Sequence, residues 1–405
     1  MVNKALLRVN VFDSSEGMPL PDAKVEVFDQ DEKTGEMISD ISGNTPEFEL
    51  ETVNGGLSET PDENGIRPYS TYKLKVSREG FSDYVADGIQ MFGGQNSYQN
   101  VIMTRTPENN GEKRVFPHTL WSDPAPKGQE EVVKPLPPGL GFVVLPDPVV
   151  PEFVTVHDGA PSDASAANYR VPFADYIKNV ACCEIYPTWP AAALEANIMA
   201  IVSFTLNRVY TEWYVSRGYD FTITSSTSFD QAFSYGRNIF DSIGKTVDYL
   251  FTTFITRPNI RQPLLAQYCN GSTVSCPGWL SQWGSKKLAD QGLDAVTILR
   301  TYYGSDVYLL EGTKVEGIPY SFPGAPIQTG TVGNGVRTVQ EQLNAISVNY
   351  PAIPRLAVDG IFGRETRRAV TEFQRIFGYE ETGIVDFGTW YGISRIYVAV
   401  ARLAV

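Results

Sequence analysis

The first quarter of the chain alternates apolar and polar residues with a period of two. The alternation runs through LLRVNVF, AKVEVF and STYKLKVS, and it places Tyr72, Leu74 and Val76 on one face of a strand. Turns rich in Gly, Pro and Asp, such as GMPLPDA and TPDENG, separate these segments. Residues 1–105 are therefore predicted to form a small β-sandwich of immunoglobulin-like or prealbumin-like topology. No cluster of reactive side chains stands out in it, so we expect a spacer, chaperone or inhibitory role.

Proline dominates the next stretch, residues 106–150, which contains KPLPPGLGFVVLPDPVV. Because proline lacks an N–H and fixes φ, neither a regular helix nor a central strand is expected there. The segment is predicted to be a linker. An extended linker is also accessible to a processing protease, and both interpretations stay open at this point.

The following segment, residues 151–320, has apolar residues at helical spacing. In VPFADYIKNVACCEIYPTWPAAALEANIMAIVSFTLNRVY this spacing lies on both sides of Pro187 and Pro190, which predicts two helices that meet near Glu184. The broad apolar face of the second helix indicates a core helix. Further on, LADQGLDAVTILRTYYG predicts a short helix that ends at Gly304.

The last segment, residues 331–405, predicts a small helical bundle. Val336, Val339, Leu343 and Ile346 share one helical face, and a second helix is expected from Thr366 to Phe377. The chain as a whole is therefore predicted to be a multidomain α+β protein. It has an N-terminal β-sandwich, a central mixed α/β core and this C-terminal bundle.

The charge of the chain argues against nucleic acid as its ligand. There are 33 basic and 47 acidic residues, a net charge of −14, and no basic stripe appears. Residues 331–405 hold eight Arg and seven Asp or Glu, so most of the excess negative charge precedes them. The N-terminus shows no secretory pattern, and no apolar run reaches membrane-spanning length. We expect neither a nucleic acid nor a membrane as a partner.

The four cysteines lie between residues 182 and 276: Cys182, Cys183, Cys269 and Cys276. Four cysteines in 405 residues do not make a disulfide scaffold. For Cys269 and Cys276 we favour free or packed thiols, while a disulfide and a metal site stay open. With only His118 and His157 a His-rich metal site is excluded, and a mixed Cys and His site stays open. No metal or cofactor is expected.

Glu184 is the candidate catalytic residue. Cleavage of a glycan needs a proton donor at the glycosidic oxygen, which is normally a carboxylic acid in an apolar setting. Glu184 has such neighbours in Ile185, Tyr186 and Trp189, and it stands where a helix must stop. On residue chemistry alone, a solvated or structural glutamate at a helix end stays open as well.

Three blocks of the chain resemble the catalytic core of stage II sporulation protein D and its relatives. They occur in the same order and read FADYIKNVACCEIYPTWPAAALEANIMAIVSFTLNRVY, TSSTSFDQAF and CPGWLSQWGSKKLADQGLDAVTILRTYYG. The resemblance is closer to the clostridial-type spore cortex-lytic enzymes in two segments, EIYPTWP and FVVLPDPVVPEFVTVHDG, and in the appended N-terminal domain. That domain is similar to a carboxypeptidase regulatory-like module. That family is made as precursors activated by subtilisin-like Csp proteases, and the resemblance covers nearly the whole chain.

The resemblance implies lytic transglycosylase chemistry, with Glu184 as the essential glutamate. In such a mechanism one carboxyl group protonates the leaving oxygen and then takes the proton of the C6 hydroxyl, which gives a 1,6-anhydro product. Hydrolysis is the weaker variant because it needs a second carboxylate, for which Asp220 or Asp230 is the nearest candidate. The residues expected to line the saccharide cleft, with core packing open for each, are Asp230, Gln231, Tyr268, Gln282 and Trp283.

Two positions depart from the wider family. The chain reads QYCNGSTVSC where many relatives have a histidine-containing segment, and Glu195 stands where relatives often have lysine. These departures put a family-type zinc site in doubt.

The C-terminal segment is similar to the type 1 peptidoglycan-binding domain. The residues that carry this resemblance are GNGVRTVQEQLNAI and DGIFGRETRRAVTEFQRIFGYEETGIVDFGTW. A domain of this kind raises the local concentration of the polymer at the catalytic domain.

Together these features predict an enzyme that degrades spore cortex peptidoglycan during germination. It would be stored as a precursor, cut by a Csp protease, and located in the cortex or coat region after synthesis in the mother cell. A non-catalytic wall-binding or spore-structural protein stays open, and so does a cell-wall hydrolase of a phage or tail-like particle. Glu184 favours the enzyme, whereas Glu195 and the segment around Cys269 point to the non-catalytic protein.

Overall fold

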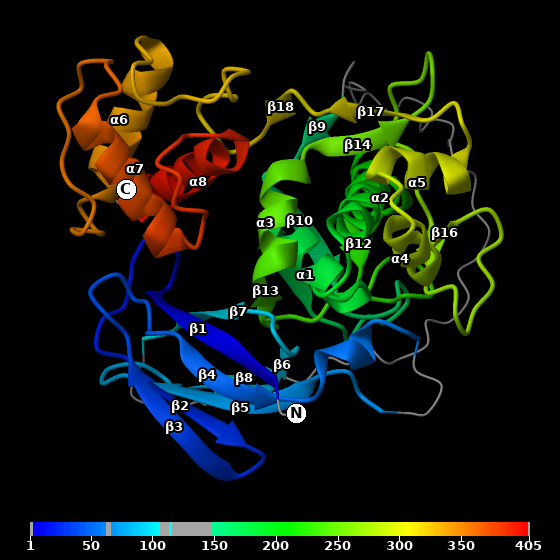
Figure 1. Cartoon of the computed structure of the whole chain (residues 1–405), viewed down its shortest axis with the longest axis horizontal. Coiled ribbons are helices and arrows are strands. Elements are labelled where there is room, and N and C mark those ends of the chain that lie inside the picture. The colour runs from blue at the N-terminus through cyan, green and yellow to red at the C-terminus, as the bar shows by residue number, and fades with distance from the viewer. Residues whose placement is uncertain (1–2, 62–65, 106–112, 116–147, 404–405) are drawn as a thin grey trace.

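The computed structural model describes residues 3–61, 66–105, 113–115 and 148–403. Figure 1 shows N-terminal sheets, a mixed central part and C-terminal helices, so the predicted multidomain α+β fold is confirmed. Most of the predicted linker at 106–150, with its processing site, lies outside the described residues. The domain boundaries stay predictions.

Two sheets form the N-terminal part. The first contains β4 (Phe48–Thr52), β1 (Asn3–Asp13) and β7 (Ser97–Met103) in this order. The second contains β3 (Glu32–Ile38), β2 (Lys24–Asp29), β5 (Ser70–Ser77), β6 (Tyr84–Met91) and β8 (Lys113–Val115). Apolar side chains of both sheets fill one core, and they include Leu7, Val9, Val25, Leu74 and Val76. The predicted β-sandwich is confirmed, and its strand periodicity follows from burial of one face.

A short strand of the central part extends the first N-terminal sheet. In β13 (Ile239–Phe240), Ile239 lies opposite Tyr98 and Phe240 opposite Ser97, antiparallel to β7. Asn238 adds two bonds to the backbone of Gln90, a donated one of 2.8 Å and an accepted one of 3.2 Å. The N-terminal and central parts are therefore joined by backbone pairing as well as by side chains.

The central part is built around a nearly fully buried helix, α2 (Ala191–Tyr210). It follows α1 (Phe173–Glu184), and the two helices meet near Glu184 as predicted. The other helices are α3 (Asp241–Leu250), α4 (Gln282–Asp290) and α5 (Ala295–Tyr303). The single helix predicted for LADQGLDAVTILRTYYG is wrong, because Gly292 adopts φ +86° between α4 and α5. The predicted end at Gly304 is confirmed.

Short strands surround these helices. β10 (Phe153–His157) pairs with β11 (Asn168–Pro172) and β12 (Ile223–Thr224), and β14 (Thr253–Thr256) pairs with β17 (Tyr308–Glu311). β15 (Tyr268–Cys269) pairs with β16 (Leu280–Ser281), and β9 (Val149–Val150) pairs with β18 (Lys314–Val315). Two 3₁₀ helices are η1 (Gly55–Ser58) and η2 (Val215–Arg217).

Three helices form the C-terminal bundle: α6 (Asn334–Ile346), α7 (Arg364–Phe377) and α8 (Phe387–Leu403). Val336, Val339, Leu343 and Ile346 are buried, so the predicted apolar face of α6 is confirmed. α7 ends at Gly378, which has φ +76° and caps the helix. In Figure 1, α8 lies between the other two helices and α3, and it contacts α3. The bundle is therefore packed against the central part.

Charged groups bind the three parts together. The Arg395 guanidinium of α8 lies 2.6 Å from Glu16 of the N-terminal part and 3.3 Å from Asp175 of α1. Asn44 donates a 2.8 Å bond to the Ile376 carbonyl of α7. A cavity of about 610 Å³ lies at this junction, and Glu184 is not among its lining residues. The N-terminal part thus contacts both other parts.

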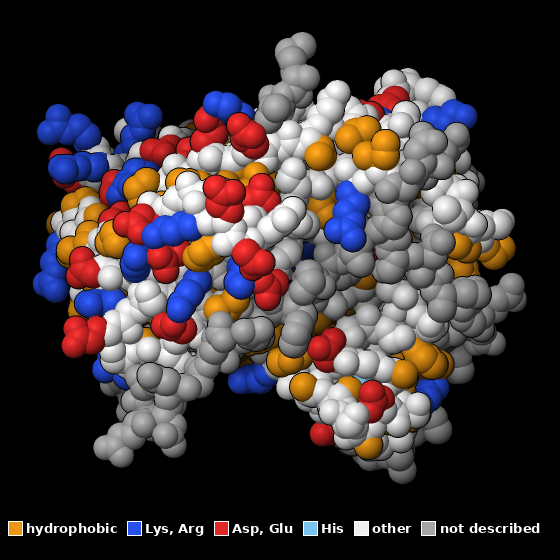
Figure 2. Space-filling view, turned by 90° about the horizontal axis from the view of Figure 1, so that it is seen from below, with side chains coloured by type: hydrophobic (Ala, Val, Ile, Leu, Met, Phe, Trp, Pro, Cys, Tyr) orange, Lys and Arg blue, Asp and Glu red, His pale blue; other side chains and the backbone are white. Residues whose placement is uncertain are grey.

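Figure 2 shows positive and negative side chains mixed over the face seen from below. In the second sheet, Lys33 of β3 pairs with Glu26 of β2 at 2.8 Å, and Lys75 of β5 pairs with Asp83, which precedes β6, at 2.9 Å. Among the described residues, no helix combines the length and apolar character needed to cross a membrane.

Candidate active site

Glu184 is the last residue of α1, and the chain turns away directly after it. Ile185 is extended, with φ −131° and ψ 160°, and its N–H still bonds to the Ala181 carbonyl. Pro187 follows, and Pro190 is the N-cap of α2, so the first helix cannot continue. The stop leaves the Glu184 side chain half-buried beside the junction of α1 and α2.

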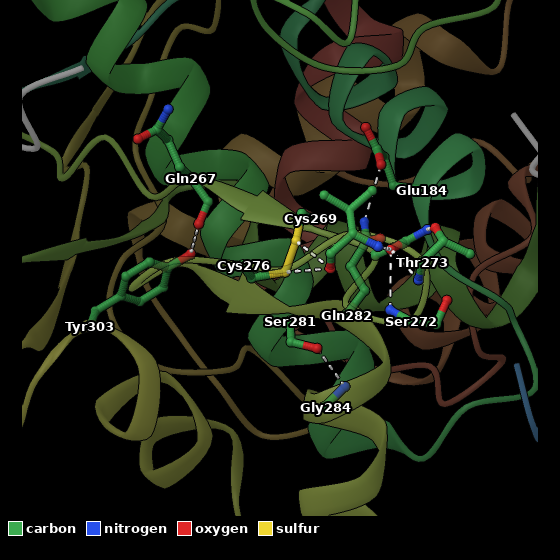
Figure 3. Close-up of a disulfide and its surroundings, with 12 residues drawn as sticks. Glu184, Gln267, Cys269, Ser272, Thr273, Cys276, Ser281, Gln282, Gly284 and Tyr303 are labelled. Carbon is green, nitrogen blue, oxygen red and sulfur yellow. Dashed lines mark hydrogen bonds between the residues drawn. A yellow bond between two sulfur atoms is a disulfide. The ribbon is translucent and has the colours of Figure 1, made fainter. Parts of the chain in front are cut away.

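Three groups from distant parts of the chain surround the Glu184 carboxylate. The Ala232 N–H donates to Oε1 at 2.9 Å, and the Gln282 side-chain amide donates to Oε2 at 3.1 Å. Figure 3 shows Glu184 above the segment of Gln282, with this second bond dashed. The Tyr268 hydroxyl lies 3.4 Å from Oε1. Both oxygens are therefore oriented by donors, which fixes where the carboxyl group can accept or deliver a proton.

Tyr268 remains a hydrogen-bond donor at neutral pH. Burial of its phenol, followed by the nearby Glu184 charge, raises the pKa of Tyr268 well above its ordinary value. The residue is 3% exposed and pairs with Leu280 across β15 and β16. The predicted cleft-lining role of Tyr268 is untested, but its position next to Glu184 follows from this strand pair.

Gln282 reaches Glu184 because α4 starts at this residue. Ser281 caps the helix by accepting the Gly284 N–H at 2.9 Å. A side chain at Gly284 would collide with Ser281 and with the Tyr302 hydroxyl. A serine cap and a glycine in the first turn thus place the Gln282 amide at the carboxylate.

Cys269 and Cys276 form the disulfide drawn in Figure 3. Their Cα atoms are 5.7 Å apart. The favoured interpretation of these cysteines as free thiols is wrong, and the disulfide alternative is confirmed. It closes a tight loop in which Asn270 Oδ1 accepts the Ser272 N–H at 3.2 Å. The spacing alone could not settle the pairing, because it also suits packed thiols.

The disulfide also removes the thiols that a mixed Cys and His metal site would need. His157 bonds to Asn168 and the Ala160 carbonyl, and His118 lies outside the described residues. Within the described part, no group of three or more metal-ligating side chains occurs. Cys182 and Cys183 are buried free thiols, and burial raises the pKa of Cys182 to about 12.

Three aromatic rings next to Glu184 form what we call the aromatic wall: Tyr186, Trp189 and Trp283. The centroids of Trp189 and Trp283 are 4.9 Å apart, and Tyr186 lies 5.5 Å from each. Tyr186 and Trp283 are half-buried. Aromatic faces of this kind suit the apolar faces of sugar rings. Sequence reasoning named only Trp283 as a binding residue, although EIYPTWP contains the other two rings.

Asp230 and Gln231 are fully buried, so the predicted cleft-lining position differs from the one observed. Asp230 accepts bonds of 2.7 Å from Arg208 and 2.6 Å from Tyr214. It points inward because its charge neutralises the buried Arg208 guanidinium. Gln231 accepts a bond of 2.9 Å from Thr205. Both precede Ala232, and they therefore hold the segment whose N–H reaches Glu184.

Asp220, the other candidate for a second carboxylate, is exposed. It accepts a 3.1 Å bond from Asn168, the first residue of β11. Glu195 lies on α2, and burial raises its pKa. Neither residue bonds to Glu184 in the described structure.

The N-terminal part contacts two of the three rings of the aromatic wall, Trp189 and Tyr186. The Trp189 indole N–H donates to the Ser58 carbonyl at 3.2 Å, and the hydroxyls of Ser58 and Thr188 are 2.8 Å apart. Phe92 packs on Tyr186 with centroids 5.6 Å apart. These contacts come from η1 and from the end of β6, and sequence periodicity gave no sign of them.

Comparison with known proteins identifies one part of the chain. Residues 332–391 match the family model of the peptidoglycan binding domain. A search of curated proteins finds no match.

Solved structures with a similar segment include 5-hydroxyisourate hydrolase from Klebsiella pneumoniae, at 13% identity and TM-score 0.17. That match covers 25% of this chain and 92% of the hydrolase. Another is 3-chlorocatechol 1,2-dioxygenase from Rhodococcus opacus, at 12% identity and TM-score 0.18, covering 26% of this chain and 61% of the dioxygenase. At these TM-scores neither likeness carries an argument. The family match alone shows that the chain carries a C-terminal peptidoglycan-binding domain and is a cell-wall-related protein.

Proposed function

We propose that the protein is a peptidoglycan lytic transglycosylase that cuts the bond between N-acetylmuramic acid and N-acetylglucosamine. The observation that carries the proposal is a single carboxylate, Glu184, oriented by the Ala232 N–H and the Gln282 amide beside an aromatic wall. The peptidoglycan-binding domain on the same chain supplies the polymer.

One carboxyl group can complete this reaction. Protonated Glu184 gives its proton to the glycosidic oxygen, and the C1–O bond to the leaving sugar breaks. Glu184, now a carboxylate, takes the proton of the C6 hydroxyl of the same muramic acid. The C6 oxygen bonds to C1 and closes the 1,6-anhydro ring, so no water is consumed. Gln282 and Ala232 hold the carboxylate between the two proton transfers.

The N-terminal part supports a stored precursor. It contacts Trp189 through Ser58 and Tyr186 through Phe92, so a glycan strand would have to compete with these contacts in the intact chain. We propose that a subtilisin-like Csp protease cuts the linker at 106–150 and frees the wall. The proposed place of action is the spore cortex during germination, and this rests on the family resemblance.

Analysis of the released fragments tests the reaction. Full-length protein, protein nicked in the linker by subtilisin, and the nicked Glu184→Gln variant are incubated with purified cortex peptidoglycan. Mass spectrometry of the soluble products is expected to find 1,6-anhydromuramic ends only with the nicked protein that retains Glu184. Ends with a reducing sugar would mean hydrolysis instead.

A non-catalytic wall-binding protein is the second candidate. It is favoured by the acidic Glu195 on α2, where relatives often have lysine, and by the contacts of the N-terminal part with the aromatic wall. Nicked, folded protein that pellets with the polymer and releases no fragments would support this candidate.

A further inference from the structure

Lys286 of α4 is an enclosed cation whose partner comes from another part of the chain. Its ammonium lies 3.0 Å from Glu59 Oε2, directly after η1, and 2.8 Å from Asp290 Oδ2. The Lys286 side chain is 7% exposed, whereas that of Glu59 is 45% exposed. Lys286 is thus an enclosed residue of the central part, whereas Glu59 belongs to the N-terminal part and would leave with it.

Lys286 also lies on the face of α4 that turns toward the candidate active site. It follows Gln282 by four residues, so the two side chains are neighbours on one helix face, about 5–6 Å apart at their Cβ atoms. Gln282 donates to Glu184 at 3.1 Å. A group bound by Lys286 would therefore lie about one helical turn from the residue that holds Glu184.

The segment of Ser58 and Glu59 presents polar groups to three residues around the aromatic wall. Besides the Glu59 carboxylate on Lys286, the Ser58 carbonyl accepts from Trp189 Nε1 at 3.2 Å, and its hydroxyl pairs with that of Thr188 at 2.8 Å. Carboxylate, carbonyl and hydroxyl oxygens are also the polar groups of a muramyl peptide. Ser58 and Glu59 therefore present to these residues the same kinds of oxygen atoms that a muramyl peptide would present.

We propose that Lys286, Trp189 and Thr188 form a subsite for a carboxylate of the peptide attached to muramic acid, which Ser58 and Glu59 occupy in the intact chain. The identity of the glycan rests on the proposed function. An ammonium group has three donors, so Lys286 can keep Asp290 while it exchanges Glu59 for a substrate carboxylate. Asp290 limits the net charge of the subsite, and the indole and hydroxyl donors add the specificity for an oxygen-rich group.

Binding in an inactive background tests the subsite. Full-length Glu184→Gln protein, with and without Glu59→Gln, is titrated with a disaccharide tetrapeptide and with the same compound after amidation of its carboxylates. Because Glu59 competes from within the chain, Glu59→Gln is expected to tighten binding of the acidic ligand about tenfold. Lys286→Gln added to Glu59→Gln should abolish the gain, and the amidated ligand should show none.

The matched control is Glu49→Gln, which removes the exposed pair with Lys4 in the same part of the chain. It should leave binding unchanged, and thermal unfolding checks that all variants fold. Equal affinity of the Glu59→Gln and Glu59 proteins, or an equal gain for the amidated ligand, would overturn the subsite. These results do not depend on turnover, so failure of the transglycosylase reaction and failure of the subsite are distinguishable.

Discussion

The Glu184 carboxylate depends on donors that can be removed one at a time. Gln282→Ala deletes the amide that donates to Oε2 at 3.1 Å and leaves α4 with its Ser281 cap. Loss of a bond to a charged group costs about 1.5–3 kcal/mol. In nicked protein, turnover of peptidoglycan is therefore expected to fall about tenfold to a hundredfold. Gln291→Ala, an exposed amide beyond the same helix, is the control. Unchanged turnover in Gln282→Ala would show that this donor does not position the carboxylate.

Asp230 is expected to stabilise the fold and not to bind peptidoglycan directly. Asp230→Asn leaves the Arg208 guanidinium, which is 1% exposed, without its counter-charge. Breaking a buried pair of this kind costs about 3–5 kcal/mol. Thermal unfolding should detect a marked loss, while the exposed Asp220→Asn should have little effect. Wild-type stability combined with weakened polymer binding would instead place Asp230 in the cleft.

At the scale of elements, the two-residue strand β13 connects the N-terminal and central parts by pairing with β7. Asn238→Ala removes both side-chain bonds to the Gln90 backbone, at a position that is 1% exposed. Each lost bond contributes about 0.5–1.5 kcal/mol, so the two fragments of nicked protein should bind each other about tenfold more weakly. Size-exclusion chromatography at graded concentrations measures this separation. Exposed Asn334→Ala should elute like wild type, and equal elution of Asn238→Ala would contradict the proposed joint.

Elements long enough to show a periodic pattern of apolar residues could be predicted from the sequence. Contacts made by short segments could not. The strands of the sandwich and the faces of α6 and α7 follow from repeated burial of one face, whereas the helix stop at Glu184 follows from Pro187 and Pro190. β13 and β15 are two residues long and have no pattern to read. The family resemblance drew attention to Gln282 and Tyr268, but Ala232 donates through its backbone, which no side-chain motif reveals. The Asp230 side chain points into the core because it pairs with Arg208. The tertiary structure brings these two residues together, so the sequence pattern could not reveal the pair.

At the scale of the whole molecule, the N-terminal part contacts both the candidate active site and the C-terminal bundle. Its η1 segment accepts a hydrogen bond from Trp189 of the aromatic wall, and its Glu16 bonds to Arg395 of α8 at 2.6 Å. Removing it would release that contact with the wall and also loosen one contact that holds the C-terminal bundle in place. Storage as a precursor would then limit both cleavage and the reach of the binding domain.

The most direct test of this account compares the products of nicked protein with and without the Glu184 carboxylate. With cortex peptidoglycan as substrate, mass spectrometry is predicted to find fragments with 1,6-anhydromuramic ends from nicked protein and none from nicked Glu184→Gln. The two proteins should pellet with the polymer to the same extent, because the binding domain is unchanged. Release of the same fragments by folded Glu184→Gln would contradict the central claim that Glu184 is the acid and base of the reaction.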